Sequence, residues 1–142
     1  MFTSDGVYVT SATKTLSFCY GHRLLNYNGK CSKLHGHNAL VDVTYQVGTI
    51  GRDGFAIDFT ELKNGIGKWI DDNLDHKTLL EETDPIASAL TTIDEEFVIV
   101  PFRPTAENIA VWIYHQAIKI HGPNVVSIKM YETPSSFVII GV

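Results

Sequence analysis

The sequence predicts an α+β domain in which a four-stranded antiparallel sheet carries two helices on one face. Three patterns favour this class: strict alternation of apolar and polar residues across 41–47, apolar residues at the helical period in two segments, 62–74 and 109–120, and a C-terminal pair of strand-like segments. With 142 residues, 44% of them hydrophobic, the chain is long enough for one buried core and is expected to form a single domain, 1–142.

Two strands are expected in the first third of the chain. The segment Thr15–His22 carries His22 on its apolar face and Cys19 on the opposite face, because successive side chains of a strand alternate. The second strand, His35–Val47, shows the clearest alternation in the sequence. Residues 23–34 between them contain several turn-forming residues and predict a loop.

Two helices follow. Asp58 and Glu61 have the spacing of a capping box, and the apolar residues after them continue at the helical period to Leu74. The second helix is expected to begin after Pro104 and to end at Gly122, where a glycine is a typical C-terminal stop.

The C-terminal part predicts a hairpin of Val125–Thr133 and Ser136–Val142. The stretch 77–104 holds one more strand-like run, Asp94–Val100, which Pro101 ends. A sheet covered by helices on one face has edges that need protection, and pairing with other subunits would supply it. We therefore expect the chain to self-associate.

Composition excludes several classes of function. The net charge is −5 and no basic run is present, which argues against nucleic acid as a partner. No apolar stretch approaches the roughly 18–20 residues of a membrane span, and the first residues lack the pattern of a signal peptide. Two cysteines are too few for a disulfide framework, so we expect a cytoplasmic protein with free thiols.

Three histidines are candidate metal ligands. His35 and His37 are two residues apart at the start of a strand, so their imidazoles share a face, and His22 ends the apolar face of the first strand. Three neutral imidazoles with an open fourth position are typical of a catalytic zinc site. A His-x-His pair alone is more often two ordinary polar residues at a strand end, but a third histidine in register favours the metal.

The two cysteines differ in their surroundings. Cys31 lies four residues before His35, and it fits a fourth zinc ligand, a thiolate base beside the metal, or a small buried loop residue. Cys19 points away from His22 under strand alternation, and the sequence predicts a structural role for it.

Other polar residues are candidates for proton transfer or binding. Asp75 and His76 follow the first helix and fit either a proton relay or a helix-end cap. Glu132 ends an apolar row of the third strand, where it fits either a ligand anchor or a solvent-facing strand end. His115 is expected on a helix surface, and the helix dipole accounts for His121.

Together these motifs resemble the 6-pyruvoyltetrahydropterin synthase / 6-carboxytetrahydropterin synthase family. Each block alone is a weak signal, but six blocks in the family's order, from residue 15 to the end, are a strong one. They are Phe18…His22-Arg-Leu24, Cys31-Ser-Lys-Leu-His-Gly-His-Asn38, Asp58-Phe-Thr-Glu-Leu-Lys63, Leu74-Asp-His76, Pro104-Thr-Ala-Glu-Asn108 and Tyr131-Glu-Thr133.

The resemblance implies a tunnelling fold (T-fold), whose subunits join their sheets into a barrel, commonly as a homohexamer of two trimers. It also implies one Zn²⁺ as cofactor, held by His22, His35 and His37.

The resemblance further assigns roles to the remaining candidates. Cys31 would be the general base, and Asp75 with His76 would form the proton relay. Glu132 would anchor the 2-amino and N3 edge of a pterin. The family's block near the pterin pocket matches Thr105 and Glu107.

The substrate implied is 7,8-dihydroneopterin triphosphate. The spacing Cys31-x-x-x-His35-Gly-His37 resembles the 6-carboxytetrahydropterin synthases of queuosine (7-deazaguanine) biosynthesis, lyases that release acetaldehyde and triphosphate. A related branch places a glutamate at or directly after the cysteine, where this chain has Ser32. The alternatives are 6-pyruvoyltetrahydropterin synthase activity and a non-catalytic module that binds pterins or purines. The run 19–21 departs from the family, which usually has small residues there.

Overall fold

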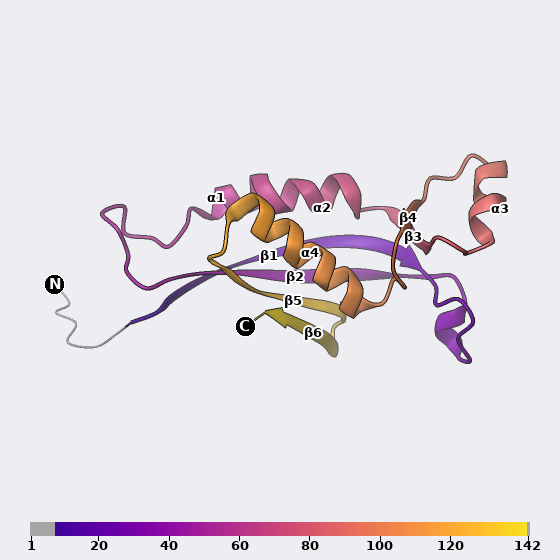
Figure 1. Cartoon of the computed structure of the whole chain (residues 1–142), viewed down its shortest axis with the longest axis horizontal. Helices are drawn as coiled ribbons and strands as arrows, with labels where there is room; N and C mark the ends of the chain where they lie inside the picture. The colour runs from indigo at the N-terminus through magenta and orange to yellow at the C-terminus, as the bar shows by residue number, and fades with distance from the viewer. Residues whose placement is uncertain (1–7, 142) are drawn as a thin grey trace.

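The strands of the structure form one mixed sheet (Figure 1). This computed structural model describes residues 8–141, and within them the strand order is β4-β3-β1-β2-β5-β6. Neighbours are antiparallel from β1 through β2 and β5 to β6, whereas β1–β3 and β3–β4 pair in parallel. The bounds are β1 Thr10–His22, β2 His35–Val47, β3 Lys77–Glu81, β4 Val98–Val100, β5 Val125–Thr133 and β6 Ser136–Gly141.

The ladder between β1 and β2 determines where the histidines lie. These strands pair antiparallel along their whole lengths, and the ladder ends at His22 opposite His35. In the same register Tyr20 stands opposite His37. Since directly opposite residues share a sheet face and the period along a strand is two, these four side chains lie on one face and Cys19 lies on the other.

One helical segment runs from residue 59 to residue 73 without a break. It begins with α1 (Phe59–Leu62), whose N-cap Asp58 accepts the backbone N–H of Thr60 at 2.8 Å. It continues through a π-helical stretch, η2 (Lys63–Gly67), into α2 (Lys68–Asn73). Asp58 therefore caps the start of the helix, where the sequence predicted it.

The second long helix, α4 (Ala106–His121), also has a clear start and stop. The side chain of Thr105 accepts the backbone N–H of Asn108 at its N-terminus, and Gly122 follows its last turn with a φ of 89°. That left-handed φ favours glycine over any residue with a Cβ. Two shorter elements, the 3₁₀ turn η1 (Lys30–Ser32) and helix α3 (Ile86–Thr92), lie in the connections.

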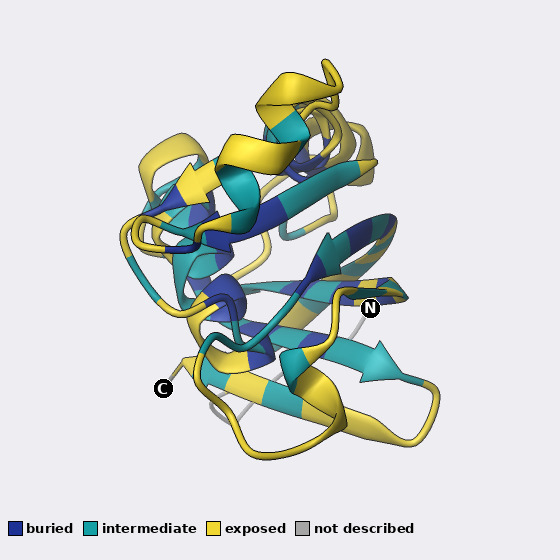
Figure 2. Cartoon of the chain, turned by 90° about the vertical axis from the view of Figure 1, so that its right-hand side faces the viewer, coloured by how far each residue is buried: buried dark blue, intermediate teal, exposed yellow. Residues whose placement is uncertain are grey.

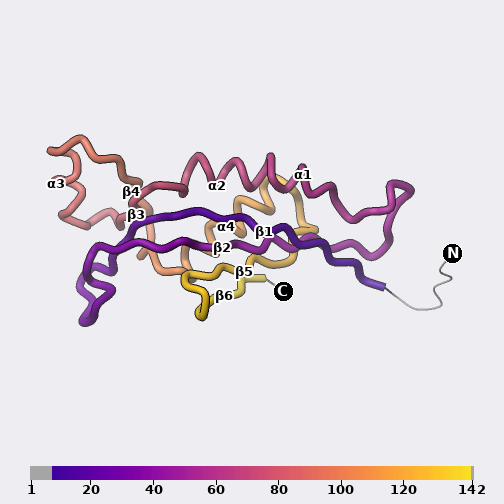
Figure 3. The backbone as a smooth tube through the Cα atoms, turned by 180° about the vertical axis from the view of Figure 1, so that it is seen from behind, coloured from indigo at the N-terminus to yellow at the C-terminus, as the bar shows by residue number. Residues whose placement is uncertain are grey.

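Both long helical segments cover the same face of the sheet. Helix α4 packs on β5, β6 and η2, and in Figure 3 it passes behind the strands, whose opposite face is turned to the viewer. Figure 2 shows the buried parts of sheet and helices facing each other, while α3 is mostly exposed. The largest fully buried side chains include Val41, Val43, Leu62, Ile66, Ile70, Leu74, Leu79, Leu80, Ile109, Ile113, Ile128 and Met130.

The structure corrects the predicted sheet in two respects. It has six strands rather than four, and β3 and β4 join in parallel, so the sheet is mixed rather than antiparallel. The run Asp94–Val100 does supply a strand, β4, but β3 and α3 were not predicted. The first strand begins at Thr10 rather than Thr15. No helix in the described residues is long and apolar enough to cross a membrane.

Candidate metal centre and active site

His22, His35 and His37 come together at the paired ends of β1 and β2. One ring nitrogen from each lies within 4.8 Å of those of the other two. The ring centroids are separated by 4.6 Å between His22 and His35, 5.1 Å between His22 and His37, and 5.0 Å between His35 and His37. The structure therefore brings the three predicted ligands to one point.

Backbone carbonyls orient two of these rings. The Nδ1 of His22 lies 2.6 Å from the carbonyl oxygen of Pro104, and the Nδ1 of His35 lies 2.6 Å from that of Lys33. A carbonyl can only accept a hydrogen bond, so Nδ1 carries the proton and donates it in both rings. Each Nε2 is then left with a free lone pair, which is the form in which histidine binds a metal.

The histidines have the two properties expected of metal ligands: unpartnered ring nitrogens and neutral imidazoles. The Nε2 atoms of His22 and His37 are buried and have no hydrogen-bond partner, although buried polar atoms are normally satisfied. Burial lowers the pKa of both imidazoles below the ordinary histidine value, which keeps them neutral near pH 7. Three neutral imidazole nitrogens are a donor set that suits zinc.

A carboxylate faces the same cluster. The Oε1 of Glu132, on β5, lies 3.5 Å from the Nε2 of His22 and 3.4 Å from the Nε2 of His37. The hydroxyl of Tyr20 donates a hydrogen bond to this oxygen over 3.3 Å. Burial, and then the negative charge of Glu132, raise the pKa of Tyr20 above its ordinary value, so the hydroxyl keeps its proton. Glu132 thus lies at the candidate metal centre.

Asp75 and His76 lie on the other side of the two strands, beside Cys19. The Nδ1 of His76 donates to Asp75 at 2.9 Å, and the backbone N–H of Cys19 donates to the same carboxylate at 3.0 Å. The bond from Cys19 is the first cause of a lowered pKa for Asp75. The Sγ of Cys19 lies within 4.8 Å of ligand atoms of both residues.

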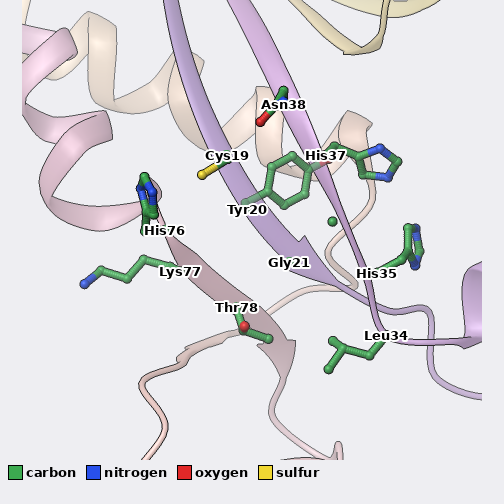
Figure 4. Close-up of a pocket in the computed structure, with 11 residues that line it drawn as sticks. Cys19, Tyr20, Gly21, Leu34, His35, His37, Asn38, His76, Lys77 and Thr78 are labelled. Carbon is green, nitrogen blue, oxygen red and sulfur yellow. The ribbon is translucent and has the colours of Figure 1, made fainter.

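A cavity of about 480 Å³ opens beside this cluster, and it is lined by Cys19 and His76 and also by the start of β2, including His35 and His37. Figure 4 shows Cys19 and His76 on the side of the strands away from the rings of His35 and His37. Parallel pairing of β1 with β3, with Tyr20 aligned to Lys77, brings His76 to this place. His76 also adopts a φ of 59°, uncommon for a residue other than glycine. The sequence predicted a structural role for Cys19, whereas the structure places it beside Asp75 and His76 as a further candidate for proton transfer.

Cys31 is exposed and lies in η1, just before β2. Its carbonyl oxygen accepts the backbone N–H of Leu24 at 2.8 Å, which closes the loop between the first two strands. The structure groups Asp75 and His76 with Cys19 rather than with Cys31.

The remaining predicted residues lie at the start of α4. Thr105 caps the helix, and Glu107 in its first turn lines a cavity of about 170 Å³ together with Glu132 and Phe137. Thr105 thus has a structural role as the N-cap, whereas Glu107 shares a cavity with Glu132.

Arg23, next to the candidate metal ligand His22, has a structural partner. Its Nε donates to Asp84 at 2.7 Å, and a second nitrogen pairs with the other carboxylate oxygen. Asp84 is 4% exposed, and it also accepts the backbone N–H of Ile86 at the start of α3. The Arg23 guanidinium lowers the pKa of Asp84. Through Asp84, this cation is linked to the start of α3.

Comparison with known proteins identifies the family to which this arrangement belongs. The sequence matches the family described as 6-pyruvoyl tetrahydropterin synthase over residues 11–141. The chain belongs to this family. A 6-carboxy-5,6,7,8-tetrahydropterin synthase from Haemophilus influenzae is 35% identical over 133 residues, which are 88% of this chain and 94% of the relative. A Rickettsia felis protein with the same name is 32% identical over 132 residues, 89% of this chain and 96% of that protein.

A solved 6-pyruvoyl tetrahydropterin synthase from Caenorhabditis elegans shows the same fold. It superposes with a TM-score of 0.72 at 18% identity, over 96% of this chain and 97% of that chain. Membership of the family and this likeness confirm, for the single chain, the T-fold that the sequence motifs implied.

Proposed function

We propose that this protein is a zinc-dependent 6-carboxytetrahydropterin synthase of queuosine (7-deazaguanine) biosynthesis. In the proposed reaction, 7,8-dihydroneopterin triphosphate and water give 6-carboxytetrahydropterin, acetaldehyde and triphosphate. The observation that carries the proposal is the set of three converging histidines, two of them with buried, unpartnered Nε2 atoms. The names of the relatives from Haemophilus influenzae and Rickettsia felis support this product over others of the family.

His22, His35 and His37 would hold the zinc. When bound, the ion supplies a Lewis acid that polarises the side-chain oxygens of the substrate. The three-histidine site is preorganised for metal binding, because hydrogen bonds to the carbonyls of Pro104 and Lys33 orient the rings of His22 and His35.

Cys31 would act as the general base. A thiolate at the exposed turn η1 takes a proton from the substrate side chain. Asp75 fixes the tautomer of His76 by accepting from Nδ1, which leaves Nε2 of His76 to take up or return a proton. Since His76 lies on the sheet face opposite the metal histidines, we assign it to the metal centre of a neighbouring copy.

Glu132 and Glu107 are the carboxylates available to the substrate. They line one cavity, and a carboxylate there can accept two N–H groups from the 2-amino and N3 edge of a pterin. Glu132 is the anchor implied by the family motif, and Thr105 fixes the start of the helix that carries Glu107.

Assembly of several copies would complete the site. Both edge strands expose large apolar side chains, with Ile139 of β6 61% exposed and Ile99 of β4 43% exposed. Strand edges of this kind are suited to pairing with another chain. We propose a homohexamer in which the sheets of the subunits join into barrels.

Incubation of the zinc-loaded protein with 7,8-dihydroneopterin triphosphate tests the proposal. We expect equal amounts of acetaldehyde and triphosphate, together with 6-carboxytetrahydropterin, identified by mass spectrometry. Triphosphate release without acetaldehyde would instead indicate a 6-pyruvoyltetrahydropterin synthase. Binding of the substrate without any product would indicate a pterin-binding module that has lost turnover.

A further inference from the structure

The separations around Glu132 are those expected between ligands of one metal ion. Its Oε1 lies 3.5 Å and 3.4 Å from the Nε2 atoms of His22 and His37. These distances are long for hydrogen bonds. Ligands 2.0–2.1 Å from a tetrahedral zinc are separated from each other by about 3.3–3.4 Å, which is close to the observed values. Both nitrogens are buried and lack hydrogen-bond partners, so the carboxylate stands beside two of the three histidines at a distance that fits a further donor to a shared ion.

Tyr20 contacts the same carboxylate oxygen. Only 3% of the Tyr20 residue is exposed, and its hydroxyl donates to the same Oε1. The ring packs edge-on against His22 with centroids 5.0 Å apart, and it lies 5.7 Å from the ring of His37. Groups that bind a metal are commonly oriented by hydrogen bonds from outer residues, and Tyr20 is such a residue for Glu132.

We propose that Glu132 is a fourth metal ligand in the substrate-free protein, and that Tyr20 is the positioning residue that keeps its carboxylate on the ion. The inference rests on the zinc site of the proposed function and deepens it. Zinc accepts carboxylate oxygens alongside imidazole nitrogens. A substrate oxygen that binds the ion would then displace Glu132, which frees the carboxylate for the pterin.

Chelator competition on four full-length proteins tests the inference: the wild type, Glu132→Gln, Tyr20→Phe and Tyr45→Phe. Gln preserves the shape of the Glu132 side chain and removes its charge. Tyr45 is a half-buried tyrosine on the same strand pair and serves as the matched control. Visible absorption of the Co²⁺-loaded proteins reports the ligand set independently of turnover, and thermal melting without metal confirms that each variant folds.

We expect Glu132→Gln to weaken zinc binding at least tenfold and to alter the Co²⁺ spectrum. Tyr20→Phe should weaken binding about tenfold, as is typical for residues that orient ligands, and Tyr45→Phe should stay within twofold of the wild type. Zinc affinity within twofold of the wild type in Glu132→Gln would overturn the ligand assignment while leaving a three-histidine site intact. An unchanged Tyr20→Phe beside a weakened Glu132→Gln would overturn the role of Tyr20. Wild-type protein that binds no zinc would overturn the proposed function as well.

Discussion

The Nε2 of His121 accepts the backbone N–H of Ile66 at 3.1 Å and so joins the last turn of α4 to the π-helical stretch η2. A π-turn disturbs the regular pattern of backbone bonds in a helix, and the imidazole satisfies one donor of that stretch. The sequence accounted for His121 by the helix dipole, which favours a protonated ring. The structure instead requires the neutral form, because a protonated Nε2 cannot accept.

This bond predicts a loss of stability in mild acid. Burial lowers the pKa of His121 in the folded state, whereas the unfolded chain has an ordinary histidine pKa near 6.5. The unfolded state therefore binds more protons below about pH 6.5, and the free energy of unfolding falls as the pH drops from there towards the folded pKa. Urea unfolding at pH 7.5 and pH 5.5 measures the difference.

His121→Gln is the matched variant for this measurement, because its amide oxygen can accept from Ile66 but does not titrate. His22 and His37 also have lowered pKa values, and comparison of the two proteins at each pH cancels their contribution. We expect a smaller drop in stability between the two pH values for the variant. Equal drops for the variant and the wild type would contradict the proposed acceptor role.

Gly65→Ala should destabilise the protein, although alanine favours an ordinary helix by about 1 kcal/mol over glycine. A Cβ at position 65 would overlap the ring of His121. Relieving such a clash in a packed region typically costs about 1–3 kcal/mol. Gly51→Ala is the control, since a Cβ there meets nothing within 4 Å. Thermal or urea unfolding of both variants checks the prediction, and equal stabilities would refute it.

Replacing each cysteine in turn shows whether Cys31 or Cys19 is the general base. If Cys31 is the base, Cys31→Ala should lower turnover about 10²–10⁴-fold, the usual contribution of a general base, with zinc still bound. Cys19→Ala should lower turnover less than tenfold, because the Cys19 backbone N–H, which the variant keeps, holds Asp75. Steady-state kinetics and metal content decide between them. Full activity of Cys31→Ala with an inactive Cys19→Ala would transfer the role of base to the thiol beside His76.

The exposed edge strands predict a defined assembly in solution. Light scattering of the wild type should give about six times the 15.8 kDa mass of one chain. Ile139→Lys places a charge at an exposed apolar position of β6 and should yield smaller species by hindering pairing at this edge. A wild-type protein that is monomeric at assay concentrations would contradict both the proposed hexamer and a relay supplied by a neighbouring copy.

Local sequence patterns predicted several elements of the fold and the positions of the three histidines. Alternation predicted β2 with its observed bounds, His35–Val47, because one face of that strand is buried and the other is not. The same period placed the rings of His22, His35 and His37 on one face. The capping box at Asp58 predicted the start of the first helix for an equally local reason.

Contacts between distant segments could not be predicted in this way. Strand β3 has only five residues, and its parallel pairing with β1, which brings His76 beside Cys19, leaves no periodic signal in either segment. The hydrogen bond between Tyr20 and Glu132 joins residues 112 positions apart and depends on β5 pairing with β2. The acceptor role of His121 likewise depends on a tertiary contact with η2.

A count of zinc ions per chain shows directly whether the three histidines bind the metal without the thiol of Cys31. Inductively coupled plasma mass spectrometry of zinc-loaded, desalted protein should find one zinc per chain in the wild type and in Cys31→Ala. It should find almost none in His37→Ala, although that variant remains folded by circular dichroism. Retention of a full zinc complement by His37→Ala, or loss of the ion from Cys31→Ala, would contradict a centre built from three histidines with the Cys31 thiol uncoordinated.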